Sequence, residues 1–427
     1  MIVSDIKVTP SKGWCELQAH VKSDTRKRFL LRYCFPQGLE ESVSPHNGDP
    51  FLAALLLPAM KVQETLEIPA PVSPELLRSA HEIQALYKSW DSTLGIVQVK
   101  AQVGEVQSSR TSRPPRRGLF FSCGVDSYYS LFKNLESHSQ DEETITDLIV
   151  VRGFDIPFAG PDFTIFQTIL ANARRVSNGL QKNVLPVATN IRDFGIEFVR
   201  WGRLYHGAAM ASVGLALEDV FDRVYIASSF SPGQLCPWGS HPALDPLWST
   251  ERLSFSHDGC NLRRVDKIRF IVQYPIVMDT LRVCTLRPFS GDVYNCGLCE
   301  KCLRTMVGLY IARALERCRT LPNSIDLRML RSIPIPQEDR YEDYAEELVA
   351  DLGSSETDSA IRSALQEALS ASARSRPSLE FSAAPYRSLL LPIASRAPPL
   401  LRAWVRLWRA LRRSPPSSIF DLFRFLR

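Results

Sequence analysis

A strand-like apolar run at residues 119–121 passes directly into a loop of small and polar residues, and this junction constrains the fold more than any other feature. A helix-like stretch follows the loop, which consists of Ser122, Cys123, Gly124, Val125, Asp126 and Ser127. Such a loop leaves backbone N–H groups unpaired beside a helix N-terminus, where they can bind phosphate oxygens. The junction therefore predicts a phosphate-binding loop, with a surface turn rich in Ser, Gly and Asp as the alternative.

The residue types within this loop indicate how it would hold ATP. Gly124 permits close approach of the backbone, and the hydroxyls of Ser122 and Ser127 add donors. Asp126 can orient a Mg²⁺ ion or the loop itself, because a cation that bridges phosphates prefers carboxylate oxygens. No lysine of the G-x-x-x-x-G-K-[ST] pattern follows, so the loop differs from that of motor and kinase-like NTPases.

Four cysteines form the second informative pattern. Cys296, Cys299 and Cys302 follow one another with two residues between each pair, and Cys284 lies upstream. This spacing suits a closed tetrahedral Zn²⁺ site and favours zinc over the competing iron–sulfur cluster. The other cysteines are scattered and are expected to be reduced and packed: Cys15, Cys34, Cys123, Cys236, Cys260 and Cys318.

The length of 427 residues exceeds one ordinary core, so we expect more than one domain. Residues 1–106 contain strand-like alternation and a helix-like run at 74–90, which predicts a small α+β domain. The polar, proline-bearing segment 107–117 is typical of a linker. Residues 118–340 would form the main domain and 341–427 a helical C-terminal region.

Strands and helices alternate after residue 118. Strand candidates at 119–122, 147–152, 183–188 and 223–228 are separated by helical stretches at 128–135, 163–180 and 206–217. This order predicts an α/β fold with right-handed crossovers and a parallel sheet. Ligands of such sheets bind beyond the carboxyl ends of the strands, where both the 122–127 loop and Ser228 would lie.

The net charge of +5 conceals a basic tail. Residues 385–427 contain nine Arg and one Asp, and several of these Arg recur at helical spacing beside apolar residues. Such a helix could contact an anionic membrane surface peripherally, or dock on the body of the protein. Nucleic acid is not expected as a partner, because no base-reading module accompanies the charge. The beginning of the chain shows no export signal and no apolar run spans a membrane, so the cytoplasm is the expected location.

Taken together, the strand, loop, helix and downstream cysteines in residues 118–310 resemble the PP-loop (adenine nucleotide alpha hydrolase-like) adenylating enzymes. The closest likeness is to the 7-cyano-7-deazaguanine synthase branch, which also carries one Cys followed by a Cys-x2-Cys-x2-Cys run. The segment 264–268, Arg-Val-Asp-Lys-Ile, is similar to the lysine-bearing helix start of that branch. One departure is Cys123, which stands where the family usually has Gly, so the backbone must tolerate a Cβ and the thiol can project near the phosphates.

The whole layout, including the N-terminal region, is similar to the UDP-N-acetylmuramoyl-L-alanyl-L-glutamate epimerases over most of residues 1–340. This resemblance implies Mg-ATP-dependent adenylation of a carboxylate on a small-molecule substrate, with release of diphosphate, followed by exchange of the glutamate Cα proton. A deazaguanine-synthase-like enzyme that forms an amide or nitrile is one alternative. A zinc-stabilised protein that senses ATP without turnover is another.

Candidates for acid/base work lie in the segment 228–258, which should border the mouth of the site. His241 could act as a base near neutral pH, and Asp245 or Glu251 could bind or orient Mg²⁺. The tryptophans of the same segment could stack a base or sugar. His206 stands at a helix start and either faces the site or packs beside Trp201. A well-packed surface loop is the alternative interpretation of the segment.

Overall fold

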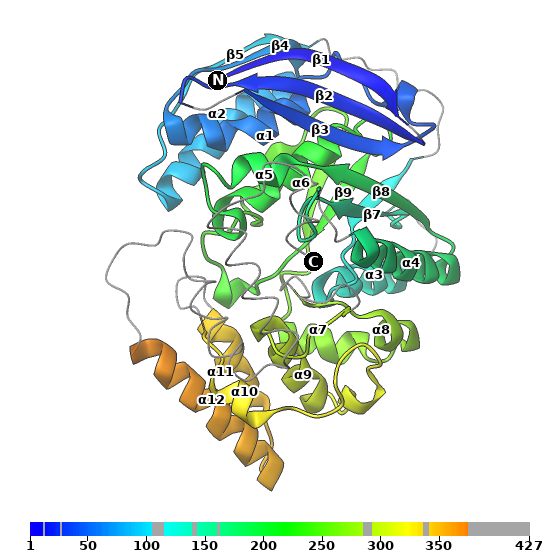
Figure 1. Ribbon diagram of the computed structural model, residues 1–427, viewed down its shortest axis with the longest axis vertical. Helices are drawn as coiled ribbons and strands as arrows, with labels where there is room; N and C mark the ends of the chain where they lie inside the picture. The colour runs from blue at the N-terminus through cyan, green and yellow to red at the C-terminus, as the bar shows by residue number, and fades with distance from the viewer. Residues whose placement is uncertain are drawn as a thin grey trace, which may run out of the picture.

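The computed structural model describes residues 1–11, 13–25, 28–104, 115–138, 143–159, 163–284, 293–335 and 341–374. The basic tail predicted at 385–427 and most of the predicted linker lie outside these residues. Within the described part, strands of residues 2–103 and strands of residues 117–258 join in one sheet (Figure 1). In the described part of the chain, no helix combines the length and the apolar character needed to cross a membrane.

Ten strands form a single sheet in the order β10-β9-β6-β7-β8-β3-β2-β1-β4-β5. Their bounds are β1 Ile2–Ser11, β2 Trp14–Lys22, β3 Phe29–Pro36, β4 Leu66–Val72, β5 Val99–Val103, β6 Arg117–Phe120, β7 Asp147–Arg152, β8 Asn183–Thr189, β9 Arg223–Ala227 and β10 Ser254–Asp258. The five strands from β6 to β10 are mutually parallel. The prediction of an α/β fold with a mostly parallel sheet is therefore confirmed.

The helices cover the sheet on both faces. Their bounds are α1 Asp49–Val62, α2 Pro74–Trp90, α3 Val125–Ser137, α4 Phe163–Leu180, α5 Ile191–Gly195, α6 His206–Leu215, α7 Arg264–Ile271, α8 Pro275–Thr280, α9 Glu300–Ile311, α10 Leu327–Arg331, α11 Tyr341–Asp351 and α12 Glu356–Arg374. Buried side chains from α1, α2, α5 and α6 form one core, and those from α3, α4, α7, α8 and α9 form the other. Within β6, Leu119 belongs to the second core and Phe120 to the first, as expected of a strand buried on both faces.

The parallel strands have the order of a doubly wound nucleotide-binding sheet. Counted from β6, their order across the sheet is 5-4-1-2-3, so the chain reverses its direction of progress between β6 and β9. Loops that follow the two strands at this reversal diverge, and the crevice between them is the usual ligand site of such sheets. The predicted loop at 122–127 follows β6, and Ser228 follows β9.

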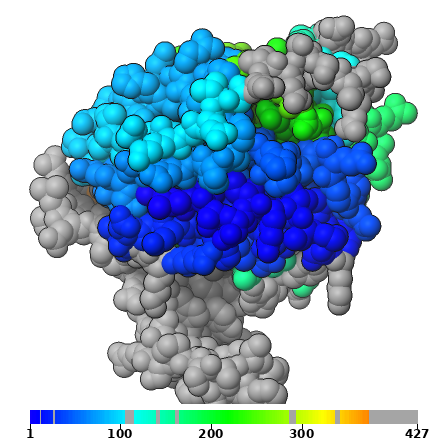
Figure 2. Space-filling model, turned by 90° about the horizontal axis from the view of Figure 1, so that it is seen from above, coloured from blue at the N-terminus to red at the C-terminus, as the bar shows by residue number. Residues whose placement is uncertain are grey.

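The N-terminal region extends the same sheet and does not form one of its own. Strand β3 pairs in antiparallel fashion with β8, through Tyr33 with Thr189 and Cys34 with Ala188. Buried residues of α1 and α6 share one core, and the Tyr33 hydroxyl is 2.6 Å from the hydroxyl of Ser212. Seen from above, the first hundred residues cover most of the coloured face (Figure 2). The two expected units therefore meet across a continuous sheet and a shared core.

Candidate functional site

The loop after β6 forms a tight turn that opens into α3. Gly124 is the N-cap of α3, and its N–H donates to the hydroxyls of Ser127 at 3.1 Å and Ser122 at 3.3 Å. A Cβ on Gly124 would lie 3.0 Å from the Ser122 oxygen, so this close turn favours glycine. The first-turn N–H groups of α3 have no partner within their own helix, as at any helix start. The loop after β6 is thus a tight turn that leads directly into a helix start.

Cys123 occupies a left-handed backbone position, with φ of 58°. This conformation costs about 1–2 kcal/mol for a residue that has a Cβ, which explains why glycine suits the position. The thiol is fully buried in the core on the α3 side, and this burial raises its pKa to about 12. Cys123 therefore packs inward as a neutral thiol and does not project toward the loop's ligand side.

Asp126 is held by two buried cations from α7. Its carboxylate accepts from Arg264 at 2.8 Å and lies 3.4 Å from the Lys267 ammonium, which also donates to the Ser228 carbonyl at 2.7 Å. Burial alone would raise the pKa of Asp126, but Arg264 and Lys267 together lower it. Because Lys267 is only 1% exposed, this network rigidly connects the loop after β6 with the end of β9. Asp126 thus orients the loop.

A second group of charges lies beside the loop without forming ion pairs. The Arg282 backbone N–H donates to the Cys123 carbonyl at 2.8 Å. Its side chain is 6% exposed, and the buried Nε has no hydrogen-bond partner among the residues that the structure describes. Lys301, Arg282 and Arg192 all lower the pKa of Asp155, although the surrounding protein desolvates that carboxyl. Asp155 is nevertheless solvent-exposed. Asp155 is therefore an exposed carboxylate under the electrostatic influence of these cations.

Within the described part of the chain, the side chains of Asp155, Arg282 and Lys301 make no hydrogen bond or ion pair with a protein group. Unpaired buried charge is costly unless it is compensated. We call these three residues, with the 122–127 loop, Arg264 and Lys267, the phosphate-loop cleft. The cleft carries four cationic side chains against the carboxylates of Asp126 and Asp155. This excess of positive charge suits a polyanionic ligand.

The predicted catalytic residues gather at the same edge of the sheet but differ in their surroundings. His206 is half-buried between Trp201 and Trp238, and burial lowers its pKa. The aspartates on both sides of it, Asp245 and Asp155, act in the opposite direction and raise its pKa. His206 therefore stands between the phosphate-loop cleft and the segment that follows β9.

His241 has a local structural role. Its Nδ1 accepts from the Ala243 N–H at 3.1 Å, and its ring packs edge-on against Trp90 of α2 at 5.3 Å between centroids. Burial lowers its pKa, and nearby His257 lowers it further. Of the other residues predicted in this segment, Trp248 is fully buried and Glu251 binds the first turn of α2 through Ser73 and Glu75. Glu251 thus caps a helix and does not border the cleft.

Asp245 is fully buried and has a partner that the sequence did not reveal. Its carboxylate lies 2.7 Å from Nδ1 of His257 on β10 and accepts from the Ser240 hydroxyl at 2.6 Å and the His241 N–H at 3.2 Å. The His257 side chain is 3% exposed, and its Nε2 has no hydrogen-bond partner within the described ranges. The spacing of twelve residues between Asp245 and His257 carries no recognisable motif, so only the fold brings them together.

The four predicted cysteines lie together. Their sulfur atoms are all within 4.8 Å of one another, with 3.8 Å between Cys296 and Cys302 and 3.9 Å between Cys284 and Cys299. A tetrahedron with metal–sulfur bonds of about 2.3 Å places sulfurs about 3.8 Å apart, which agrees with these distances. None of the four forms a disulfide. The cluster could therefore hold a metal such as zinc.

Backbone and amide groups position these sulfurs. Cys296 Sγ accepts from the N–H groups of Leu298 and Cys299, and Cys299 Sγ accepts from that of Cys302. The side chain of Asn295 accepts from the Cys284 N–H at 3.1 Å and donates to the Leu281 carbonyl at 2.8 Å. Hydrogen bonds with the other three sulfurs lower the pKa of Cys284. Such donors stabilise thiolates, the form that binds a metal.

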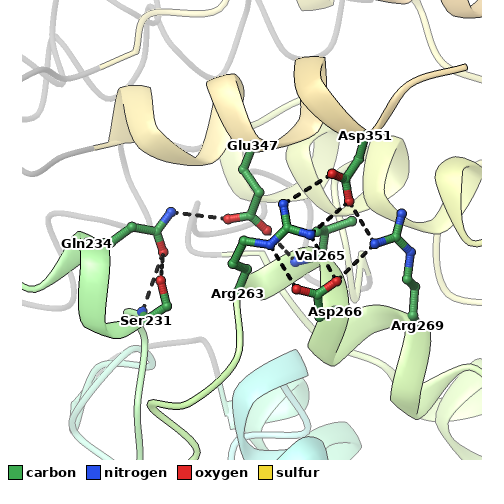
Figure 3. Close-up of polar contacts among 8 residues, drawn as sticks. All are labelled: Ser231, Gln234, Arg263, Val265, Asp266, Arg269, Glu347 and Asp351. Atoms are coloured by element: carbon green, nitrogen blue, oxygen red, sulfur yellow. Dashed lines mark hydrogen bonds and ion pairs between the residues drawn. The ribbon is translucent and has the colours of Figure 1, made fainter.

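Helix α11 fixes the start of α7, the helix that carries Arg264 and Lys267 (Figure 3). Glu347 accepts from the Val265 N–H at 2.6 Å and from Gln234 at 3.1 Å, while Asp351 pairs with Arg263 and Arg269. Tyr344 donates to the Ser229 carbonyl at 2.7 Å. The acidic side chains on α11 thus satisfy the N-terminus of α7 and hold it against the ends of β9 and β10.

Comparison with known proteins adds no assignment: no family model, no curated protein and no solved structure matches this chain. The interpretation of the site therefore depends on its geometry and chemistry.

Proposed function

We propose that this chain binds ATP in the phosphate-loop cleft and transfers the adenylyl group to a carboxylate of a small-molecule substrate. The observation that carries this proposal is the pair of cations, Arg282 and Lys301, which have no hydrogen bond or ion pair with the described residues and lie beside the loop after β6, where the strand order reverses. The likeness of the 122–127 loop and the cysteine run to the PP-loop enzymes agrees with this geometry.

The charges of the cleft match the needs of diphosphate release. Negative charge grows on the departing diphosphate as the α-phosphorus is transferred, and preorganised cations stabilise it most effectively where water is excluded. Lys301 and Arg282 are available for that charge, and the N–H groups at the start of α3 can bind the phosphate oxygens. Arg264 and Lys267 are already occupied by Asp126, so they set the shape of the loop.

Asp126 and Asp155 differ in their contacts, and we assign these two carboxylates different roles. Both oxygens of Asp126 face cations, Oδ2 toward Arg264 and Oδ1 toward Lys267. Asp155 has no such partner and is the unpaired carboxylate of the cleft. A Mg²⁺ ion that arrives with ATP commonly takes one or two carboxylates in addition to phosphate oxygens, and Asp155 fits that role better than Asp126. The ion would neutralise phosphate charge.

Zinc is the metal we assign to the four cysteines. A closed set of four thiolates at tetrahedral separations, with N–H donors to the sulfurs, is typical of a structural zinc site. Arg282 lies two residues before Cys284, and Lys301 lies between Cys299 and Cys302. The metal would therefore fix the backbone that presents both unpaired cations to the cleft.

The most specific form of the proposal is epimerisation of the terminal L-glutamate of UDP-MurNAc-L-Ala-L-Glu, with release of AMP and diphosphate in peptidoglycan precursor synthesis. Adenylation removes the negative charge of the carboxylate and makes the α-proton easier to abstract. The imidazoles and the buried carboxylate at the neighbouring edge of the sheet supply acid/base groups for that step. An amide-forming or nitrile-forming ligase would share the first step but require ammonia.

The proposal is tested by ATP–pyrophosphate exchange that depends on an added carboxylate substrate. We expect Asp126→Asn to lower this exchange at least tenfold, about 1.4 kcal/mol in transition-state free energy, because Arg264 and Lys267 lose their anchor. Asp279→Asn is the matched control, since Asp279 pairs with the exposed Arg319 away from the cleft. Undiminished exchange in well-folded Asp126→Asn protein would contradict the loop assignment.

The same assay separates the alternatives. Saturable ATP binding without carboxylate-dependent exchange indicates a sensor. Product formation that requires ammonia indicates an amide or nitrile former. Deuterium at the glutamate Cα after incubation in D₂O without ammonia, together with recovery of D-glutamate, supports the epimerase.

A further inference from the structure

We propose that His257, supported by Asp245, is the base that removes the α-proton of the adenylated substrate. This inference rests on the proposed function and deepens it, since it assigns the second chemical step to a pair of residues on β10 and the 236–248 segment. The sequence pattern had favoured His241 for this role. The contacts of the two histidines distinguish them.

The contact between Asp245 and His257 has the geometry of a carboxylate that supports a base. Asp245 Oδ2 lies 2.7 Å from His257 Nδ1, so a proton on Nδ1 is held by the carboxylate and the lone pair of a neutral imidazole is left on Nε2. Ser240 donates to the same carboxylate oxygen at 2.6 Å. Asp245 is thereby fixed from two sides. A carboxylate behind Nδ1 also stabilises the imidazolium that forms when Nε2 accepts a proton.

Among the described residues, none forms a hydrogen bond with Nε2 of His257. The side chain is 3% exposed, and a buried acceptor without a hydrogen bond is unfavourable in a residue that serves packing alone. His241 differs, because its Nδ1 already accepts the Ala243 N–H and its ring packs on Trp90. In neutral His241 the ring proton therefore lies on Nε2, whereas in His257 a proton on Nδ1 leaves the lone pair on Nε2.

The position of His257 in the sheet also agrees with this role. His257 is the penultimate residue of β10, paired with Ile226 near the end of β9 in the parallel register. It therefore lies at the carboxyl edge of the sheet, the edge that carries the phosphate-loop cleft. The 236–248 segment that holds Asp245 also approaches His206, because a Cβ on Gly239 would come within 2.6 Å of the His206 Nδ1.

The proposed step balances without an external oxidant or reductant. The Cα–H bond of the acyl adenylate breaks, its proton passes to His257 Nε2, and its electron pair moves toward the adenylated carbonyl to give an enolate. A proton from solvent then enters at the opposite face and inverts the centre. Water finally cleaves the acyl–phosphate bond, which gives the free carboxylate and AMP.

The test separates adenylation from proton removal. Each protein is incubated with UDP-MurNAc-L-Ala-L-Glu and Mg-ATP in D₂O, and both pyrophosphate exchange and deuterium at the glutamate Cα are measured. We expect His257→Gln to lower deuterium entry at least about a hundredfold, within the usual range for a general base, while pyrophosphate exchange falls far less. His241→Gln is the matched control and should retain most of its deuterium entry.

Asp245→Asn is the second variant, in case the first does not fold. The amide cannot stabilise an imidazolium, so deuterium entry should again fall more than pyrophosphate exchange. Deuterium entry in His257→Gln that equals the wild-type rate overturns the assignment to His257, and so does wild-type adenylation that places no deuterium at Cα. Wild-type protein that shows no carboxylate-dependent exchange overturns the proposed function instead.

Discussion

The four-cysteine site and the phosphate-loop cleft are assembled in different ways. Three of the cysteines lie within seven residues, and local N–H groups hold their sulfurs. The cleft draws its charges from segments that are far apart in the sequence, including Asp155 after β7 and Lys267 on α7. Its unpaired cations, however, come from the immediate neighbourhood of the cysteines. In the proposed function, a locally encoded metal site would position the charges of a cleft that is encoded over long range.

Loss of the metal should have the largest effect and tests whether the two sites are coupled. We expect Cys299→Ser to reduce bound zinc from one ion per chain to nearly none and to unfold the segment around α9, because a closed site contributes a binding free energy on the order of 10 kcal/mol to folding. ATP binding should fall with it, since Lys301 loses its support. Elemental analysis, hydrogen exchange and nucleotide titration measure the three effects.

Cys318→Ser provides the control for that experiment, because Cys318 is also buried but lies outside the cluster. Normal zinc content and normal ATP affinity in Cys299→Ser would contradict the coupling between the four-cysteine site and the phosphate-loop cleft. An iron–sulfur absorption spectrum in the wild-type protein would show that the four cysteines hold an iron–sulfur cluster and not zinc.

Removal of an unpaired cation should have a smaller effect that separates function from stability. We expect Arg282→Met to lower pyrophosphate exchange about tenfold or more, equivalent to at least about 1.4 kcal/mol. The reason is that the substitution removes a positive charge that would stabilise the departing diphosphate. Its thermal midpoint should stay the same or rise, since a buried guanidinium without a partner costs stability. Arg319→Met is the control, as that side chain is 80% exposed. A large loss of stability in Arg282→Met would indicate a structural role.

The smallest expected effect concerns a polar cluster away from both sites. Burial raises the pKa of Asp49 and of Glu218 to about 7, and the Asp49 carboxylate further raises that of Glu218. A pKa that is higher in the folded state means that stability present at pH 4 is lost as the pH rises through about 7. We therefore expect Asp49→Asn to be more stable than the wild type at pH 8, by on the order of 1 kcal/mol, but not at pH 4.

Urea unfolding at the two pH values measures this difference. Glu251→Gln should behave in the opposite sense, because hydrogen bonds from Ser73 and Glu75 outweigh burial and lower the pKa of Glu251. A cleft substitution should lower ATP–pyrophosphate exchange by the same factor whether or not Asp49→Asn or Glu251→Gln is also present. A pH-independent difference for Asp49→Asn would contradict the assignment of the raised pKa.

Several elements were predictable because their patterns are local. The strand at 147–152 and the helix at 163–180 occur with the predicted bounds. Helix α1 was not predicted, since every residue from Asp49 to Met60 is buried and the helix has no polar face to create a periodic pattern. Strand β10 was missed for the opposite reason, because its sequence Ser-Phe-Ser-His-Asp is polar for a strand.

The sequence by itself determined the four-cysteine cluster and the residues of the loop after β6, because each depends on residues close together in the chain, and the alternation of strands and helices was enough to predict a parallel sheet. Only the tertiary structure decided that β3 joins β8 in one sheet, that Arg264 and Lys267 bind Asp126, and that His257 is the partner of Asp245. The physical reason is that spacing within a turn or helix fixes short distances, whereas contacts between distant segments depend on how whole elements pack. The unpaired state of Arg282 and Lys301 is likewise a property of that packing.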